Sequence, residues 1–142
     1  MNTKEYLEQV EKWDKIIKNR IDEISRLEML AQNISSKPLD KVSVVSSGPK
    51  DKIGGAVSKI IDIQNTIDGY MTKREAIIEQ LETLSIDEYQ ILYLKYIRGC
   101  SFSMILDKLN ESGKYSERKM YRKYKDGLNN FEIKYGSVYA DL

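Results

Sequence analysis

Two stretches of the chain space their apolar residues alternately three and four positions apart, from about residue 3 to 34 and from about residue 51 to 84. This heptad rhythm is typical of long helices that pack lengthwise against a partner helix. In the first stretch the apolar positions are Tyr6, Val10, Trp13, Ile17, Ile24, Leu27, Ala31 and Ile34. In the second they are Ile53, Ala56, Ile60, Ile63, Ile67, Tyr70, Ile77, Leu81 and Leu84. We therefore predict an all-α protein whose N-terminal part, residues 1–84, consists of two long helices.

The segment between the two patterns, residues 35–50, contains both prolines and is rich in serine, so we predict a loop there. An antiparallel helical hairpin closed by this loop would bury the two apolar stripes against each other. Pairing between chains is compatible with a hairpin, because further apolar residues flank the seam. These flanking residues are Leu7, Ile16, Ile21, Ile61, Met71 and Ile78. Since exposed apolar stripes usually mark interfaces, we expect a homo-oligomer, most simply a homodimer through the N-terminal helices.

Charged and glycine residues interrupt the two seams. In an antiparallel hairpin Arg74 would lie near Trp13, where its guanidinium can stack on the indole ring. We favour the simpler interpretation that Arg20 and Arg74 both extend to the edge of the seam. The pair Gly54 and Gly55 lacks the Lys-Ser or Lys-Thr of a phosphate-binding loop, and we expect it to allow close helix approach.

Composition excludes several functional classes. The chain has no His and a single Cys, Cys100, which rules out imidazole catalysis, Cys zinc clusters and an internal disulfide. No acid pair or nucleophile stands beside a candidate base, so we expect no enzyme, no metal and no cofactor. The first residues lack an apolar signal core, and no apolar run approaches the roughly 20 residues of a membrane span. These features fit a protein of the reducing cytoplasm without membrane contact.

The pattern of the chain changes at residue 85. Ser85, Ser101 and Ser116 each precede a short helical pattern and are suited to cap it. Glu88 follows Ser85 at the spacing of a capping box, in which the Glu reaches back to the Ser amide. Gly99 is placed to end the first of these helices. Three short helices punctuated in this way predict a helix-turn-helix domain over residues 85–135, followed by a tail over residues 136–142.

The strings ILYLKYIRGCSFSMI (residues 91–105) and YSERKMYRKYKDGLNNF (residues 115–131) resemble region four of sigma factors. The matching positions are Ile91, Leu92, Leu94, Lys95, Tyr96, Ile97, Gly99, Ser101, Phe102, Ile105, Ser116, Met120, Tyr124, Gly127 and Phe131. The resemblance implies a DNA-reading helix that begins after Ser116. Two departures bear on the helix crossing and the depth of groove entry. Met-Ile-Leu at 104–106 replaces the family's Glu-Ile-Ala, and the turn over residues 110–115 is longer.

The string DKIGGAVSKIIDIQNTID (residues 51–68) resembles a stretch of the ArpU- and RinA-type transcriptional regulators of phages. Those small proteins likewise place a helical N-terminal part and a loop before a sigma-like helix-turn-helix, so the resemblance covers most of the chain. It implies a phage or prophage regulator of late genes that binds promoter DNA. The N-terminal helices would then set dimer geometry or contact host RNA polymerase.

The predicted recognition helix, residues 117–131, has one core-facing stripe and one basic face. The stripe consists of Met120, Tyr124, Leu128 and Phe131. Residues 114–125 hold six basic residues and one acidic one, although the whole chain holds 23 basic and 22 acidic residues. We expect the Arg side chains to read guanine edges and the Lys side chains to contact phosphates. The predicted contacts to double-stranded DNA are Lys114, Ser116, Arg118, Lys119, Tyr121, Arg122, Lys123 and Lys125.

Two other functions fit the same sequence features. A small terminase-like subunit for phage DNA packaging also joins a helix-turn-helix to helical oligomerisation segments, and it would assemble into a large ring. A helical protein-interaction module would use the same fold without binding DNA.

Overall fold

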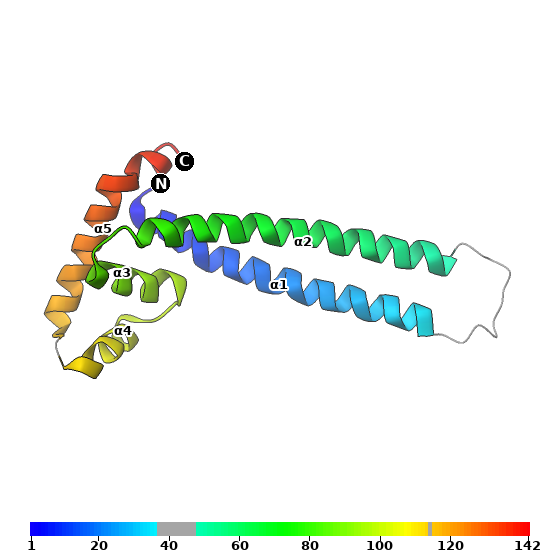
Figure 1. Ribbon diagram of the computed structural model, residues 1–142, viewed down its shortest axis with the longest axis horizontal. Coiled ribbons are helices and arrows are strands. Elements are labelled where there is room, and N and C mark those ends of the chain that lie inside the picture. The colour runs from blue at the N-terminus through cyan, green and yellow to red at the C-terminus, as the bar shows by residue number, and fades with distance from the viewer. Residues whose placement is uncertain (37–47, 114) are drawn as a thin grey trace. The chain divides into compact units, whose positions relative to one another are not determined.

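The computed structural model describes residues 1–36, 48–113 and 115–142, and every regular element within these ranges is a helix. The long helices are α1 (Thr3–Ser36) and α2 (Gly48–Leu81). They are followed by α3 (Ile86–Leu92), a π-helical segment (Tyr93–Ile97), α4 (Phe102–Leu109), a 3₁₀ turn (Asn110–Ser112) and α5 (Glu117–Tyr139) (Figure 1). The prediction of an all-α protein is therefore confirmed.

The chain forms two compact units. One comprises residues 15–71, and the other combines residues 1–14 with residues 72–142. We call them the two-helix unit and the C-terminal unit. The predicted boundary at residue 84 does not coincide with a boundary between these two units. The first turns of α1 and the last turns of α2 belong to the C-terminal unit. None of the described helices is long and apolar enough to cross a membrane.

The helix ends differ slightly from the predicted ones. Helix α2 ends at Leu81 instead of residue 84, because the Thr83 hydroxyl donates a 2.7 Å hydrogen bond to the carbonyl of Gln80 and the chain turns there. Helix α1 continues to Ser36 and α2 begins at Gly48. Both ends of the predicted loop 35–50 are therefore helical. The rest of that loop, residues 37–47, lies outside the described residues.

In the two-helix unit, parts of α1 and α2 lie side by side (Figure 1). Of its side chains that the structure describes, the buried hydrophobic ones are Ile17, Ala56 and Ile63. Arg20 is exposed, as expected for a side chain that extends to the edge of a seam. The prediction for Gly54 and Gly55 is wrong, because a Cβ at either position meets no described atom within 4 Å. No close helix approach therefore requires these glycines.

The core of the C-terminal unit joins residues that are far apart in the sequence. From α1 and α2 it takes Tyr6, Leu7, Val10, Ile77 and Leu81. The remaining buried members are Ile91, Leu92, Tyr96, Ile97, Cys100, Ile105, Leu109, Met120, Tyr124, Leu128, Phe131 and Tyr139. Leu7 was predicted to flank the seam, but its side chain is fully buried in this core. Arg74, which was predicted to extend to the edge of the seam, donates from its Nε to Asp14 Oδ1 at 2.8 Å.

Helix α5 continues two turns beyond the predicted end of the recognition helix. The reason is that its aromatic stripe continues from Phe131 through Tyr135 to Tyr139 at steps of four. The Tyr139 ring stacks on Tyr6 at 4.4 Å between centroids, and its hydroxyl lies 2.6 Å from Thr3 Oγ1 in a buried hydrogen bond. Most of the predicted tail 136–142 is therefore helix packed on the first turn of α1.

Candidate functional site

The predicted serine caps are present and set where each short helix begins. The side-chain oxygens of Ser85, Ser101 and Ser116 accept hydrogen bonds from backbone amides three residues later, at 3.4, 3.3 and 3.1 Å. Gly99 has a φ of 68°, which a residue with a Cβ rarely adopts, and it separates the π-helical segment from α4. The local sequence signals thus fix where α5, the basic helix, starts.

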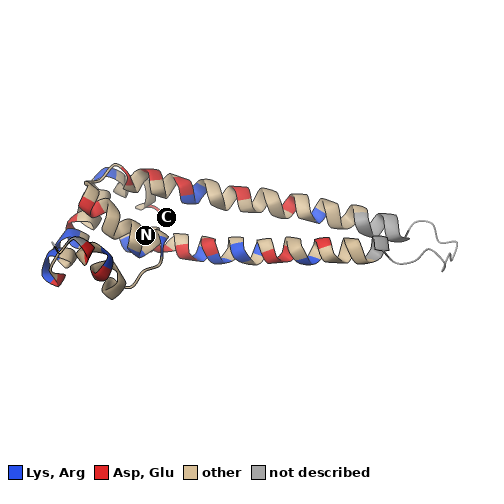
Figure 2. Ribbon diagram, turned by 60° about the horizontal axis from the view of Figure 1, so that its bottom comes forward, with Lys and Arg blue, Asp and Glu red and all other residues tan. Residues whose placement is uncertain are grey.

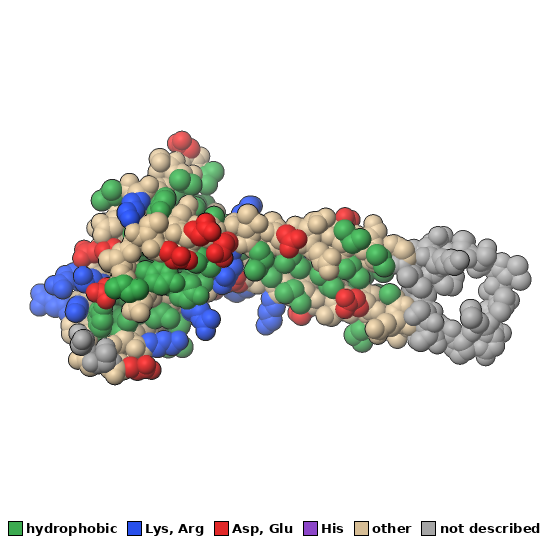
Figure 3. All heavy atoms as spheres, in the orientation of Figure 1, with side chains coloured by type: hydrophobic (Ala, Val, Ile, Leu, Met, Phe, Trp, Pro, Cys, Tyr) green, Lys and Arg blue, Asp and Glu red, His purple; other side chains and the backbone are tan. Residues whose placement is uncertain are grey.

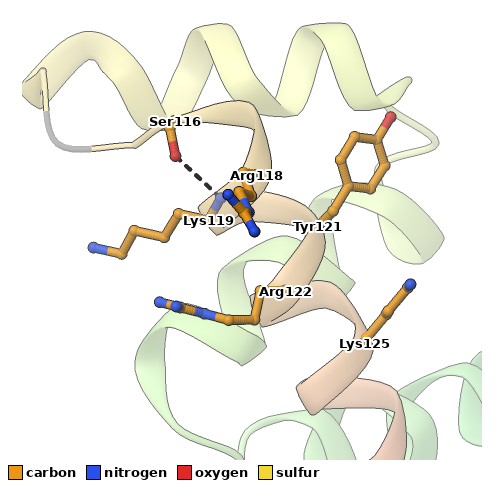
Figure 4. A pocket seen from close by; sticks show the side chains of 6 residues that line it. All are labelled: Ser116, Arg118, Lys119, Tyr121, Arg122 and Lys125. Atoms are coloured by element: carbon orange, nitrogen blue, oxygen red, sulfur yellow. Dashed lines mark hydrogen bonds between the residues drawn. The ribbon is translucent and has the colours of Figure 1, made fainter.

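The first three turns of α5 form an open hollow on the surface of the C-terminal unit (Figure 4). Its lining residues are Ser116, Arg118, Lys119, Tyr121, Arg122 and Lys125. In Figure 4 Lys119 and Arg122 extend to one side of the view, Tyr121 and Lys125 to the other, and Arg118 lies between them. Four of the lining residues are cationic. Six of the eight residues predicted from the sequence are therefore brought together. We call this set the basic face.

The other two predicted residues do not belong to the basic face. Lys123 is half-buried and does not line the hollow. It lies two positions from both Tyr121 and Lys125, and residues two apart on a helix point to different sides. Lys123 therefore points away from the hollow, and its predicted phosphate contact stays a prediction. Lys114 lies outside the described residues.

An aromatic support beneath the basic face was missed by the sequence analysis. The ring of Tyr121, which is 38% exposed, packs on Phe102 of α4 at 5.0 Å between centroids. Phe102 also meets Tyr124 edge to face at 4.9 Å, and Lys95 Nζ lies 4.4 Å from its ring centroid. Phe102 occupies the aromatic position of the sigma-like pattern. That position was the only indication in the sequence that Phe102 has a structural role here. Its contacts limit the positions that the Tyr121 ring can take.

The longer turn before α5 is held by side chains. Gly113 adopts a φ of 70°, and the Tyr115 amide donates to Asn110 Oδ1 at 3.1 Å. Lys119 Nζ then lies 4.5 Å from the centroid of the Tyr115 ring. Burial, together with a hydrogen bond to Asp87 and the charge of that carboxylate, raises the pKa of Tyr115 to about 12. The turn therefore links α3 to the first turn of α5.

Helix α5 is fixed against α3 by close packing and by two polar contacts. A Cβ on Gly127 would lie 3.1 Å from Leu92 Cδ1, so only glycine fits without displacing that neighbour. The hydroxyls of Tyr96 and Tyr124 form a buried hydrogen bond of 2.6 Å. Burial first, and this bond second, raise the pKa of Tyr96. These contacts fix the orientation of the basic face.

The predicted capping box is only half formed. Ser85 caps α3, but the Glu88 carboxylate accepts hydrogen bonds of 2.9 and 3.0 Å from Asn130 Nδ2 of α5. Glu88 is one of the buried polar residues, and Asn130 lies within reach because the close approach at Gly127 brings the helices together. The Glu88 side chain therefore connects α3 to α5 by hydrogen bonds and does not cap the start of α3.

The basic face presents hydrogen-bond donors and cations. In Figure 2 the ribbon segments coloured blue for Lys and Arg lie in the C-terminal unit as well as along the two long helices. Among the described residues, no group of three or more acidic or Cys side chains is placed to hold a metal ion. Such a surface attracts negatively charged groups.

Comparisons with known proteins give no relative. No family model, no curated protein and no solved structure matches the chain.

Proposed function

We propose that the protein is a cytoplasmic, non-enzymatic transcriptional regulator of a phage or prophage that binds double-stranded DNA. In this proposal α3, α4 and α5 form a sigma-like helix-turn-helix, and the N-terminal end of α5 enters the major groove. The observation that carries it is the basic face, which gathers four cations and a supported tyrosine on the first turns of one capped helix. The sequence resemblance to sigma region four and to ArpU- and RinA-type regulators is the basis for proposing that the bound DNA is promoter DNA and that the regulated genes are late genes.

The residues of the basic face divide into two roles. Arg118 and Arg122 are exposed and one turn apart, and their planar guanidinium groups suit the O6 and N7 acceptors of guanine. Lys119 and Lys125 are point charges at the edges of the hollow and suit phosphate oxygens, which position the protein without reading sequence. Ser116 is committed to capping α5, so its part is to fix the helix start.

The charge distribution favours sequence-specific binding over general affinity for nucleic acid. The whole chain has a net charge of +1, so long-range attraction to DNA is weak. Base contacts and a second half-site must then supply most of the useful affinity. The same regulator would contact host RNA polymerase through surfaces outside the basic face.

Footprinting on DNA that flanks the gene, repeated at several salt concentrations, tests the proposal. If Lys119 and Lys125 each neutralise one phosphate, log affinity should fall against log salt with a slope of about −1.8 per subunit, or about −3.6 for a dimer. A slope near zero, or no protected site, contradicts DNA binding and leaves the protein-interaction alternative.

Single substitutions test the assignment of roles. Arg118→Ala or Arg122→Ala should each weaken specific binding by about 1 to 3 kcal/mol and relax base preference at one position. Lys123→Ala is the matched control, since Lys123 does not line the hollow, and it should bind nearly as the parent does. If both Arg variants discriminate specific from random DNA as well as the parent, the base-reading role is wrong.

A further inference from the structure

Among its described side chains, the two-helix unit exposes more large apolar ones than it buries. Besides the buried Ile17, Ala56 and Ile63, the same residues 15–71 carry six large hydrophobic side chains that are 47–62% exposed. They are Ile21, Met29, Leu30, Val57, Ile61 and Met71. In Figure 3 green side chains are visible on the surface over the two long helices. Two helices alone have only one mutual interface, so their outer apolar surface needs another covering.

The exposed residues of α2 form a regular stripe. Val57, Ile61, Gln64, Asp68 and Met71 follow one another at steps of four, three, four and three. This is the spacing of a second heptad seam, one residue removed from the inner one. We call these five residues the outer stripe. It carries a single charged residue, Asp68.

The opposite side of the two-helix unit has a different character. There an open hollow between α1 and α2 is lined by Ile16, Asn19, Arg20, Glu23, Leu27, Lys59, Asp62 and Ile63. Val57 and Ile61 each lie two residues from Lys59, and Ile21 lies two residues from both Asn19 and Glu23. Residues two apart on a helix point to different sides, so these three apolar side chains face away from the charged hollow. The unit thus has one charged side and one apolar side.

We propose that the outer stripe is the dimer interface and that its occupant is the outer stripe of a second copy, running antiparallel. In one antiparallel register, Ile61 of each copy lies against Met71 of the other, and Gln64 of each lies against Asp68 of the other. The apolar Ile61 and Met71 then meet each other, Val57 lies against Glu75, and an amide donor meets a carboxylate that can accept several hydrogen bonds. Such self-complementarity is what a twofold-symmetric interface requires.

The exposed apolar area of the two-helix unit agrees with pairing between two copies of the chain. Ile21, Val57, Ile61 and Met71, each about half exposed, offer roughly 350 Å² of apolar surface per copy. A dimer at the lower end of the stable range buries about 600 Å² per copy, of which somewhat more than half is apolar. The four side chains therefore nearly supply the apolar share, and the polar residues beside the stripe form the rim.

The mass of the full chain in solution, measured without DNA by sedimentation or light scattering, tests the proposal. We expect twice the chain mass of 16.5 kDa at about micromolar concentration. Ile61→Lys and Met71→Lys should each weaken self-association at least tenfold while the helical circular dichroism stays unchanged. Ile133→Lys is the control, because Ile133 is 81% exposed on α5, outside the two-helix unit, and this variant should remain a dimer. A monomeric parent, or an Ile61→Lys variant that stays dimeric, overturns the proposal.

Disulfide trapping tests the direction of pairing. In a Cys100→Ala background, a chain with both Ile61→Cys and Met71→Cys should form covalent dimers under mild oxidation, because facing positions lie within bonding distance. Gln64→Cys alone should not cross-link, because Gln64 faces Asp68 in this register. Efficient cross-linking of Gln64→Cys to itself indicates another register or parallel pairing and overturns the antiparallel arrangement.

The dimer and the DNA proposal fail separately. A monomer that still protects a DNA site overturns only the interface, and a dimer that binds no DNA overturns only the proposed function.

Discussion

At the scale of single residues, Tyr115 shows how one side chain organises the approach to the basic face. Its amide is held by Asn110, its ring contacts the ammonium of Lys119, and its hydroxyl is hydrogen-bonded to Asp87 of α3. The turn of residues 110–115 is longer than in the sigma-like pattern. These contacts compensate for that length by fixing the last residue before the Ser116 cap.

We expect the environment of Tyr115 to make stability fall at alkaline pH. The folded-state pKa of about 12 exceeds the ordinary value of 10.0, so the folded protein retains this proton where the unfolded chain has lost it. The contribution is complete below pH 10 and is lost as the pH rises from 10 towards 12. Urea unfolding of the parent and of Tyr115→Phe at several pH values measures it. If the difference between the two proteins is the same at both ends of this range, the pKa is not raised.

Side-chain capping could be predicted at this scale because it is local. Ser85, Ser101 and Ser116 bond to amides only three residues away, so the sequence spacing determines the contact. The partner of Glu88 could not be predicted, because Asn130 is 42 residues away and becomes available only once α5 crosses α3. For the same reason the role of Phe102 under Tyr121 was not foreseen.

At the scale of elements, the crossing of α3 and α5 depends on Gly127. A Cβ at this position would meet Leu92 at 3.1 Å and the Cβ of Glu88 at 3.3 Å, both from α3. Helix α5 carries the whole basic face, so its distance from α3 determines where the exposed Arg and Lys side chains lie.

Replacing Gly127 with Leu should therefore destabilise the protein by about 1 to 3 kcal/mol, because the added atoms overpack a filled crossing. Gly69→Leu is the matched control, since a Cβ at Gly69 meets nothing within 4 Å of the described residues. The control should gain up to about 1 kcal/mol, because leucine favours a helix more than glycine does. Thermal unfolding followed by circular dichroism measures both, and equal effects at the two sites would contradict a tight crossing.

The long helices could be predicted because their periodicity extends over many turns. The end of α5 could not, because Tyr135 and Tyr139 carry hydroxyls and stand in a polar sequence, so they do not mark a core by composition. The π-helical turn at Tyr93–Ile97, in which the Arg98 amide bonds to the carbonyl of Tyr93 at 3.1 Å, has no sequence signature either. Tyr96 and Ile97 of this turn are buried in a core with residues that are distant in the sequence, so its geometry depends on that packing.

At the scale of the whole molecule, the C-terminal unit is discontinuous in sequence. Its core contains Leu7 and Val10 from α1 together with Phe131 and Tyr139 from α5. A division of the chain at residue 84 follows the change in sequence pattern, but it cuts through this core. Heptad spacing in residues 3–34 predicted a long helix without indicating that its first two turns pack in the same core as α3, α4 and α5.

We expect Leu7→Ala to destabilise helices that begin about 80 residues later in the chain. Leu7 is fully buried, so the substitution should cost about 2 to 5 kcal/mol and lower hydrogen-exchange protection along α5. Leu30→Ala, on the same helix but 50% exposed, is the control and should leave α5 unchanged. Unaltered protection of α5 in Leu7→Ala would show that residues 85–142 fold independently of the N-terminal residues.

The hydrogen bond between Thr3 and Tyr139 spans 136 positions and has a consequence for synthesis on the ribosome. At about 5 to 20 residues per second, Tyr6, Leu7 and Val10 emerge on the order of ten seconds before α5 exists. During that interval their apolar side chains lack the native partners that α5 supplies, Phe131 and Tyr139 among them. The nascent chain therefore exposes this part of its core until α5 has been made, and in that period chaperones, or the neighbouring turns of α2, are its available protection.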